Sequence, residues 1–337
     1  MVLVTGGTGL LGTYFLLQLV RLNKKVRVLL RHNAPKHEVL ELFKIYEPEK
    51  YLQFYNSLQW VEGDLLDISS LIIALEGVTH VYHIAGKVSF DENQKDELYK
   101  VNVEGTKNII NISIEKQIEK FCFISSIATL DIIPGQPYID EKAEWNFKNI
   151  HSSYASSKYA AEMEVWRGSQ EGLKVIVVNP GIILGSGNWE RSSGFLYDMA
   201  MTKNAFYPSG LSAYIDAEDV SKISIQLMDN NSIFNEKYIL VSENATYQKV
   251  FQILRKYFNK KPPIKISDFW LSKIALFSRI LPIKKKLNKA TFLALTSKTE
   301  YCNKKINETL GFTFTPLKKS LEFHANNYLH YKKIKND

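Results

Sequence analysis

Tyr154 and Lys158 are the residues whose types and spacing most clearly suggest chemistry in this chain of 337 residues. Four positions apart in a helix, two side chains share one face, so the lysine ammonium could lower the pKa of the phenol from about 10. A tyrosine with a lowered pKa can give a proton to a carbonyl oxygen or take one from an alcohol. The pair therefore suggests acid–base catalysis at a carbon–oxygen bond.

Spacing alone does not single out this pair, because Tyr-x-x-x-Lys occurs seven times in the chain. A proline interrupts the pair at 46–50, and the pair at 138–142 follows a proline-containing loop. Four others lie in the C-terminal third, beyond the predicted sheet. Only Tyr154 opens a predicted helix between two predicted strands, and the Ser126 hydroxyl, at the end of the first, could bind the same substrate oxygen. We therefore predict Ser126, Tyr154 and Lys158 as catalytic residues; the alternative is a structural tyrosine beside a solvated lysine.

A glycine cluster near the N-terminus predicts that a dinucleotide binds beside this pair. Three β-forming residues at 2–4 lead into Gly6, Gly9 and Gly12, and an apolar helical run at 14–20 follows. A strand, a tight turn and a helix start in this order place a pyrophosphate on the N-terminus of the helix. The alternative is a glycine-rich loop without a ligand.

The end of the second predicted strand indicates which dinucleotide binds. Rossmann units that prefer NAD carry an acid about 20 residues past the glycines, where it binds the ribose 2′-hydroxyl. Here the strand at 25–30 ends in Arg31, and no acid precedes Glu38. Because a guanidinium suits a 2′-phosphate, we predict NADP(H) in preference to NAD(H). The alternative is that Arg31 is merely solvated.

Strand-like and helix-like segments alternate along the first half of the chain. Further strand-like segments lie at 59–64, 80–86, 120–126 and 173–178, and helical patterns at 98–119 and 154–167. This alternation predicts an α/β fold with a Rossmann-type, doubly wound parallel sheet. Ligands of such sheets bind beyond the carboxyl ends of the strands, so the predicted catalytic and cofactor-binding residues are expected to meet there.

Seven short motifs resemble those of extended short-chain dehydrogenases/reductases, in the epimerase/dehydratase superfamily. The motifs are T-G-G-T-G-L-L-G at 5–12, G-D-L-L-D at 63–67, H-I-A-G at 83–86, V-N-V-E-G-T at 101–106, I-S-S-I-A-T at 124–129, Y-A-S-S-K at 154–158 and N-P-G-I-I-L-G at 179–185. They occur in the family's order. The segment at 213–220 further resembles the one by which the family's chain returns to the sheet.

The resemblance implies a role for each matching residue. Tyr154 would be the general acid/base, Lys158 would bind the ribose and lower the tyrosine's pKa, Ser126 would polarise the carbonyl, and Asn102 would support a proton relay. The implied cofactor-binding residues also include Gly6, Gly9, Leu10, Leu11, Gly12, Asp64, Leu65, Ala85, Gly86, Lys87, Pro180, Gly181, Ile182 and Ile183.

The resemblance also implies how the chain is divided. Residues 1–180 would form the cofactor-binding Rossmann domain, to which the chain returns at about 211–245. Residues 181–210 and 246–337 would form a smaller, mostly helical substrate-binding region. Many relatives pair through helices beside the catalytic tyrosine, so a homodimer is a further expectation.

The motifs favour one branch of the superfamily over others. Ile127 and Ala128 stand where dehydratases carry an Asp-Glu pair, and Ser212 stands where epimerases place an arginine, although Arg191 could substitute. V-R-V-L-L-R at 26–31 is closer to dihydroflavonol-reductase-like and 3β-hydroxysteroid-dehydrogenase-like members. We therefore predict an NADP(H)-dependent oxidoreductase acting on a fairly apolar carbonyl or alcohol. A sugar-nucleotide epimerase and a non-catalytic NADP-sensing protein remain the alternatives.

The substrate region is rich in aromatic side chains. Predicted substrate contacts are Ser89, Trp189, Arg191 and Tyr207, and further aromatics in the region are Phe195, Tyr197 and Phe206. These aromatics would suit an apolar pocket, although core packing explains them equally well.

Composition and charge limit the possible partners and the possible location of the protein. The two cysteines, Cys122 and Cys302, form neither a disulfide framework nor a metal-ligand set, so we expect a cytoplasmic protein without a metal. No apolar run reaches the roughly 20 residues of a membrane-spanning helix. From residue 255 onward, the sequence has 19 lysines and arginines but only five acidic residues. Because these cations are scattered, a solvated face is favoured over nucleic-acid binding.

One amphipathic stretch leaves peripheral membrane contact open. Residues 269–286 place Trp270, Ile274, Phe277 and Leu281 on one helical face, followed by a basic run. Such a helix could lie on a membrane surface. The commoner alternative, which we favour, is a helix packed on the protein's own core.

Overall fold

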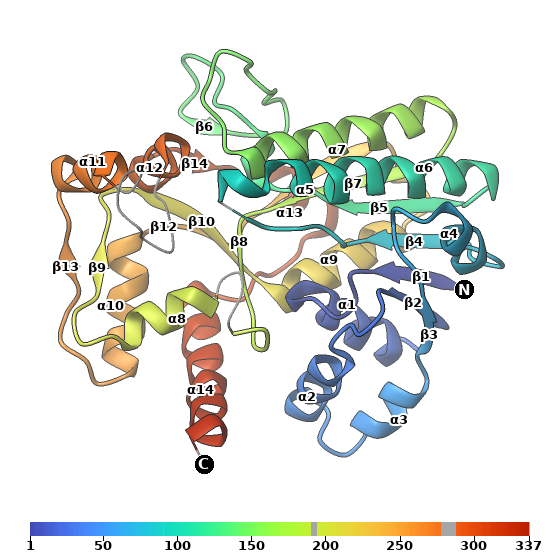
Figure 1. Ribbon diagram of the computed structural model, residues 1–337, viewed down its shortest axis with the longest axis horizontal. Helices are drawn as coiled ribbons and strands as arrows, with labels where there is room; N and C mark the ends of the chain where they lie inside the picture. The colour runs from blue at the N-terminus through green and yellow to red at the C-terminus, as the bar shows by residue number, and fades with distance from the viewer. Residues whose placement is uncertain (90, 190–193, 278–287, 337) are drawn as a thin grey trace.

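A seven-stranded, entirely parallel sheet forms the centre of the larger lobe of the computed structural model, which describes residues 1–89, 91–189, 194–277 and 288–336 (Figure 1). The strands are β1 (Val2–Thr5), β2 (Val26–Leu30), β3 (Gln59–Glu62), β4 (His80–His83), β5 (Lys120–Ile124), β7 (Val175–Pro180) and β11 (Glu236–Leu240). Their order is β11-β7-β5-β4-β1-β2-β3, so the winding direction reverses between β1 and β4. This reversal is where a doubly wound sheet binds ligands.

Helices cover both faces of this sheet. One face carries α1 (Leu10–Arg21), α2 (Lys36–Tyr46) and α9 (Ala217–Asp229), and the other carries α4 (Ile68–Ala74), α6 (Gly105–Glu115) and α7 (Ser153–Gln170). Neighbouring strand residues point to opposite faces, so Val4 packs in the first of these cores and Leu3 in the second. Burial on both sides explains why β1, β5 and β7, in the middle of the sheet, are almost entirely apolar.

A side-chain cap fixes where α7 begins, and one irregular turn interrupts the helical segment before α6. Ser152 caps α7, its Oγ accepting a hydrogen bond from the amide of Ala155 at 3.1 Å. Between α5 (Lys95–Tyr99) and α6, residues Lys100–Glu104 form a turn of π-helix. Such turns are rare and frequently occur at functional sites. The short helix α3 (Tyr51–Asn56) precedes β3.

The smaller lobe is built around a second sheet and the C-terminal helices. Its strands are β8 (Ile182–Leu184), β10 (Leu211–Asp216) and β12 (Glu243–Thr246), in the order β12-β10-β8. Two short ribbons pair β9 (Phe206–Tyr207) with β13 (Ile264–Lys265), and β6 (Tyr138–Ile139) with β14 (Glu300–Tyr301). Its helices are α8 (Gly194–Met201), α10 (Tyr247–Tyr257), α11 (Asp268–Phe277), α12 (Lys289–Thr296) and α14 (Leu317–Asn336), whereas α13 (Lys304–Leu310) packs on β11 of the large sheet.

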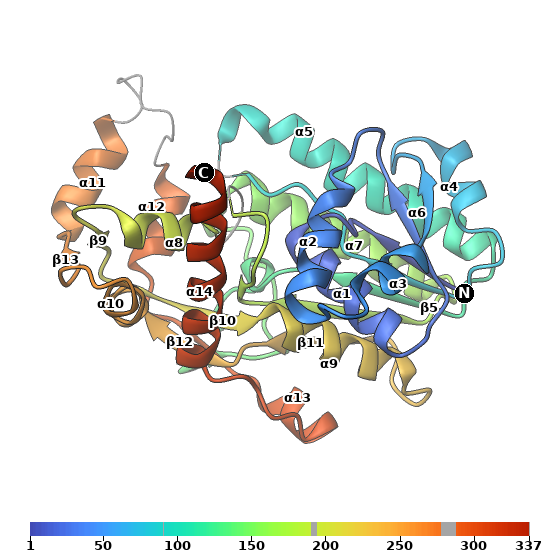
Figure 2. The same ribbon diagram turned by 90° about the horizontal axis from the view of Figure 1, so that it is seen from below.

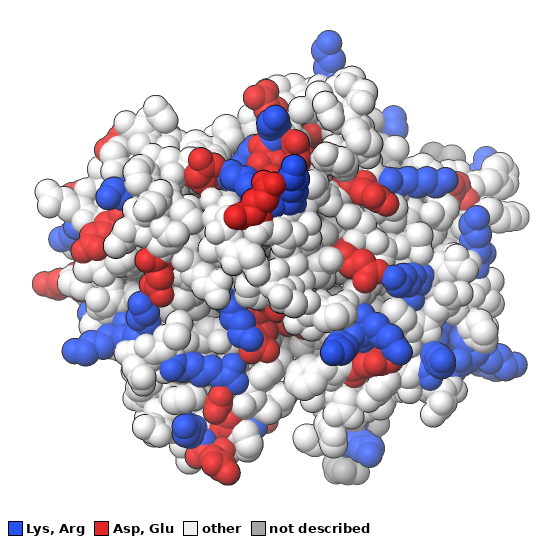
Figure 3. All heavy atoms as spheres, turned by 180° about the vertical axis from the view of Figure 1, so that it is seen from behind, with Lys and Arg blue, Asp and Glu red and all other residues white. Residues whose placement is uncertain are grey.

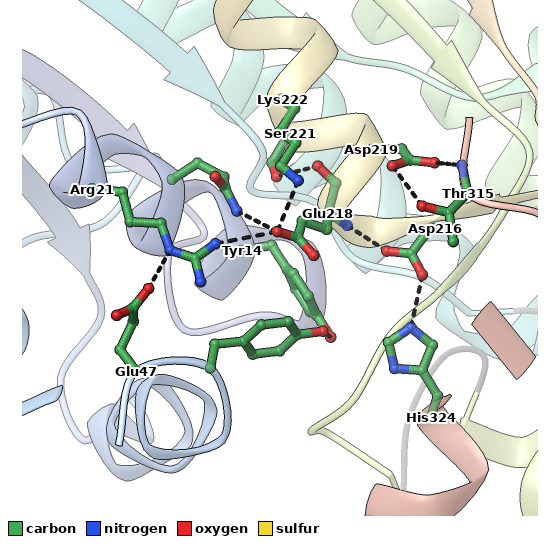
Figure 4. Close-up of polar contacts among 12 residues, drawn as sticks. Tyr14, Arg21, Glu47, Asp216, Glu218, Asp219, Ser221, Lys222, Thr315 and His324 are labelled. Carbon is green, nitrogen blue, oxygen red and sulfur yellow. Dashed lines mark hydrogen bonds and ion pairs between the residues drawn. The ribbon is translucent and has the colours of Figure 1, made fainter. Parts of the chain in front are cut away.

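An acidic turn at the start of α9 joins the two lobes (Figure 4). Asp216 caps α9 and also accepts hydrogen bonds from Ser320 at 2.6 Å and His324 at 3.0 Å, both on α14. Two residues along, Glu218 forms an ion pair with Arg21 of α1 at 3.1 Å. Thus α9 holds the C-terminal helix against the larger lobe.

The structure confirms the predicted fold class and corrects two details of the topology. Every strand-like segment predicted in the first 180 residues is a strand of the large sheet. The segment at 213–220 forms β10 and the start of α9, and β10 joins the small sheet. The chain returns to the large sheet through β11, which pairs with β7 and which the sequence did not predict. The domain boundaries themselves stay a prediction.

Candidate active site

The glycine turn between β1 and α1 forms a tight cradle. Gly6 has a φ of +71°, and a Cβ atom there would lie 2.6 Å from the amide nitrogen of Ala85. A Cβ atom on Gly12 would lie 2.0 Å from the carbonyl oxygen of Gly6. Both positions therefore require glycine. Gly9, the N-cap of α1, provides no side chain to occupy the helix N-terminus, so the cradle fits the pyrophosphate of a dinucleotide.

A buried chain of hydrogen bonds connects this cradle to the neighbouring loop. The amide of Ala85 donates to Thr5 Oγ1 at 3.2 Å, and Thr5 Oγ1 lies 2.7 Å from His83 Nδ1. His83 Nε2 lies 3.0 Å from the hydroxyl of Thr106, which donates to the carbonyl of Asn102 at 2.5 Å. Burial lowers the pKa of His83 to about 3, so the ring is neutral and can donate on one side and accept on the other.

Asn102 holds the loop after β4 in place. Its side chain accepts from the amide of Lys87 at 2.7 Å and donates to the carbonyl of Lys87 at 3.0 Å. It also donates to Ser157 of α7 at 2.9 Å. The side-chain amide is thus used for positioning the loop that contains Ala85 and Gly86. Its part in a proton relay stays a prediction.

Tyr154, Ser126 and Lys158 meet where β5 ends and α7 begins. The Tyr154 hydroxyl forms a hydrogen bond with the Ser126 side chain. Lys158 is 5% exposed; its ammonium donates to the carbonyl of Ile124 at 2.6 Å and lies 4.1 Å from the ring centre of Phe123. The sequence therefore predicted three side chains that the fold brings together.

The electrostatics of this trio differ from the expectation. Burial raises the pKa of Tyr154, and the hydrogen bond from Ser126 opposes that rise. Burial lowers the pKa of Lys158 to about 7, whereas the nearby Glu162 carboxylate raises it. The predicted lowering of the tyrosine's pKa by the lysine is thus corrected for the protein without cofactor, because the lysine is itself desolvated and is directed at Ile124.

Glu162 is a buried carboxylate that the sequence analysis missed. It is 3% exposed and lies one helical turn beyond Lys158. It accepts hydrogen bonds from Ser125 at 2.5 Å, from Thr129 and Asn179 at 3.1 Å, and from Trp166 at 3.2 Å. It therefore ties α7 to the ends of β5 and β7. Its position four residues after Lys158 could have indicated that the two side chains lie on the same face of α7.

Arg31 lies exposed at the end of β2. No carboxylate in the described part of the chain forms an ion pair with it, so its guanidinium can bind an anion. The next residue, His32, contacts Glu62 at the end of β3, with 2.8 Å between Nδ1 and Oε1. Asp64 follows in the same loop and accepts from the amide of Leu66 at 2.9 Å.

The remaining predicted cofactor-binding residues lie along the same edge of the sheet. Pro180 ends β7 and Gly181 precedes β8, which contains Ile182 and Ile183. A Cβ atom on Gly181 would lie 2.5 Å from the carbonyl oxygen of Ala213, so this position also requires glycine.

The aromatic residues predicted to contact substrate are buried in the core of the smaller lobe. Trp189 and Tyr207 are 6% and 9% exposed and belong to the core of the smaller lobe, where Trp189 packs edge-on against Tyr197. The structure thus gives these aromatics a packing role, and contact with substrate stays a prediction. Ser89 accepts from the amide of Asp91 at 3.2 Å. Arg191 lies outside the described residues.

Two features are absent from the described residues. No group of three or more His, Cys, Asp or Glu side chains there is arranged to hold a metal ion. No helix in the same residues has the length and apolar character needed to cross a bilayer.

The fold defines a class of protein: a Rossmann-type α/β protein whose fold matches solved epimerase and dehydratase structures. Within that class, the chain belongs to the NAD-binding family described as "Male sterility protein", whose model matches residues 4–233.

Relatives and solved structures agree with this assignment. The chain is 28% identical to cinnamoyl-CoA reductase 1 of Petunia hybrida, over 77% of this chain and 73% of the relative. It is 27% identical to sterol demethylase protein B of Methylococcus capsulatus, over 81% and 80%. The crystal structure of gox2253 superposes with a TM-score of 0.83 at 25% identity, covering 98% of each chain. Such relatives support an NAD(P)-dependent function of oxidoreductase type.

Proposed function

We propose that this protein is an NADP(H)-dependent oxidoreductase that interconverts a carbonyl group and an alcohol on a small, fairly apolar substrate. The contact of Tyr154 with Ser126, beside the buried Lys158 and next to the glycine cradle, carries this proposal. The names of two relatives, cinnamoyl-CoA reductase and tetraketide alpha-pyrone reductase, support a carbonyl substrate with apolar character.

The cofactor-binding residues fit NADP(H). The cradle at Gly6 and Gly12 and the N-terminus of α1 would hold the pyrophosphate, and Arg31 would bind the 2′-phosphate through charge-assisted hydrogen bonds. Ala85 and Gly86 would lie against the nicotinamide ribose. When bound, the nicotinamide supplies or accepts the hydride.

The chain's own residues handle the proton and the substrate oxygen. In the reductive direction, Tyr154 donates its phenolic proton to the carbonyl oxygen, which Ser126 holds by a hydrogen bond. The raised pKa of Tyr154 keeps it protonated at neutral pH, as a general acid requires. Glu162 and Asn102 hold the surrounding elements in position.

Consumption of NADPH, with NADH in parallel, tests the proposal across a panel of aldehydes, ketones and flavanonols. We expect turnover with NADPH that is lost in Tyr154→Phe, a variant that keeps the ring and removes the proton donor. Faster turnover with NADH would overturn the cofactor preference. Tight cofactor binding without turnover, together with binding of a UDP- or GDP-sugar, would favour a sugar-nucleotide epimerase.

We further propose a reducing, cytoplasmic location and a homodimer. The buried Cys122 and the partly exposed Cys302 are both free thiols, which suits a reducing compartment. Tyr99 and Met163 are exposed on the helices beside the catalytic tyrosine and would be available to a second copy. Size-exclusion chromatography with light scattering measures the mass, and a monomer at all concentrations would overturn the dimer.

A further inference from the structure

Exposed apolar side chains gather at the end of the smaller lobe that is far from the large sheet. We define the α11 patch as Phe206, Ile264, Phe269, Trp270 and Ile274, which are between 44% and 63% exposed. Both ribbon views place α11, β9 and β13 together at this end of the molecule (Figures 1 and 2). Monomeric proteins rarely leave such groups of side chains together without an interaction partner.

Register and hydrogen bonds hold these side chains on neighbouring elements. Phe206 and Ile264 are directly paired residues of the β9–β13 ribbon, so their side chains share one of its faces. Asp268, the first residue of α11, accepts a hydrogen bond at 2.6 Å from Ser209, which follows β9. The helix therefore begins directly beside the ribbon.

The structure corrects the expectation that this helix packs on the protein's own core through the predicted face. Trp270 and Ile274, one turn apart on that face, are 63% and 44% exposed. In the described part of α11, the buried apolar residue is Leu271, on another face of the helix. The described part of the predicted face is thus turned to solvent, while the Phe277 side chain and Leu281, which complete that face, lie outside what the structure describes.

The surroundings of the α11 patch are strongly basic. Between residues 246 and 299 the only acid is Asp268. Apart from Lys249, which forms an ion pair with Glu243, the exposed lysines in the described part of this stretch are Lys256, Lys260, Lys261, Lys265, Lys273, Lys289 and Lys298. Within the described residues none of these seven forms an ion pair with a carboxylate. Viewed from behind, the charged side chains along the edge of the molecule that holds this lobe are mainly Lys and Arg (Figure 3).

We propose that the α11 patch docks the protein peripherally on an anionic lipid bilayer. Aromatic rings such as Phe269 and Trp270 favour the headgroup region, and aliphatic side chains such as Ile264 and Ile274 add apolar area just below it. Lysines around the patch are attracted to anionic headgroups. The aliphatic residues favour a bilayer over single-stranded nucleic acid, because they offer no flat face on which bases stack.

Co-sedimentation of the full-length protein with vesicles tests this proposal. Two kinds of vesicle are compared: phosphatidylcholine alone, and phosphatidylcholine with about a third phosphatidylglycerol. We expect binding to the anionic vesicles that weakens as salt is added. The Phe269→Ala/Trp270→Ala variant should partition at least about tenfold more weakly, because it loses apolar area that enters the headgroup region.

Phe147→Ala provides the matched control. Phe147 is the most exposed aromatic side chain of the described residues, at 80%, and lies in the loop that precedes α7. This variant should bind anionic vesicles as the wild type does. Far-UV circular dichroism establishes that all variants are folded, so a loss of binding is not a loss of structure.

Three results would overturn the proposal. One is the absence of binding to either kind of vesicle, and another is equal binding by the wild type and the double-alanine variant. The third is binding of a DNA oligonucleotide by both proteins without any vesicle binding, which would assign the basic surface to nucleic acid. The test uses no enzyme substrate, so its outcome is independent of the proposed reaction.

Discussion

Replacing Lys158, the buried lysine beside the proposed catalytic tyrosine, should stabilise the protein while abolishing the proposed activity. The pKa of Lys158 is lowered to about 7 from an ordinary value of 10.5 because its ammonium is desolvated. A difference of this size corresponds to a penalty of about 5 kcal/mol for holding the charge in the folded state. Lys158→Met removes that penalty and keeps most of the side-chain volume.

The same substitution also removes favourable contacts. The hydrogen bond to the Ile124 carbonyl and the contact with the Phe123 ring are lost, which together cost about 2–4 kcal/mol once the carbonyl is left unpaired. We therefore expect Lys158→Met to be more stable than the wild type by about 1–3 kcal/mol below neutral pH, with no reductase activity.

The pH dependence separates the charge from the other contacts. Between about pH 7 and about pH 10.5 the unfolded chain keeps the proton of Lys158 while the folded protein has released it, so wild-type stability rises with pH relative to the variant. Denaturant unfolding of the proteins without nucleotide should show the variant's advantage shrinking by about 2 kcal/mol from about pH 7 to about pH 9. Lys107→Met, at an exposed position of α6, is the control. A constant difference between wild type and Lys158→Met across this range would refute the reasoning.

Three further predictions concern the same site. Glu162→Gln removes the charge that raises the pKa of Lys158, so the rise of unfolding free energy with pH that Lys158 causes should begin at lower pH. If denaturant unfolding shows this rise beginning at the same pH in the variant and the wild type, the prediction is contradicted. Gly12→Ala should weaken NADPH binding about tenfold to a hundredfold, because its Cβ would displace the turn at Gly6. The fluorescence of the bound nucleotide measures this affinity. Arg31→Ala should weaken NADPH binding by a similar factor and leave NADH binding nearly unchanged, since only NADPH carries the 2′-phosphate. Equal effects on both nucleotides would argue against the 2′-phosphate contact.

Features that depend on short stretches of chain were predictable from residue order. The large-sheet strands of the first 180 residues follow from apolar runs bounded by helix patterns, and the structure confirms them, whereas β11 was not predicted. The need for glycine at 6 and 12 follows from the tight turn between a strand and a helix. Tyr154 and Lys158 share one face of α7 because their spacing of four residues matches the helical period. Each of these inferences uses rules that act within about one or two turns of chain.

Features that depend on long-range packing were decided by the tertiary structure. Glu162 acquires its role because Ser125, Thr129 and Asn179 reach it from other elements, which no local pattern indicates. The direction of the pKa shift of Lys158 depends on how completely the surrounding chain excludes water.

Whether an apolar side chain is a contact surface or part of a core is likewise decided by packing. Trp189 and Trp270 are both aromatic residues of the smaller lobe, yet one is 6% exposed and the other 63%. Hydrophobicity favours burial of both, but only the chain folded around each determines which of them is covered. Sequence therefore predicted the elements and the reacting groups, whereas solvent access, and with it charge state and surface, came from the assembled fold.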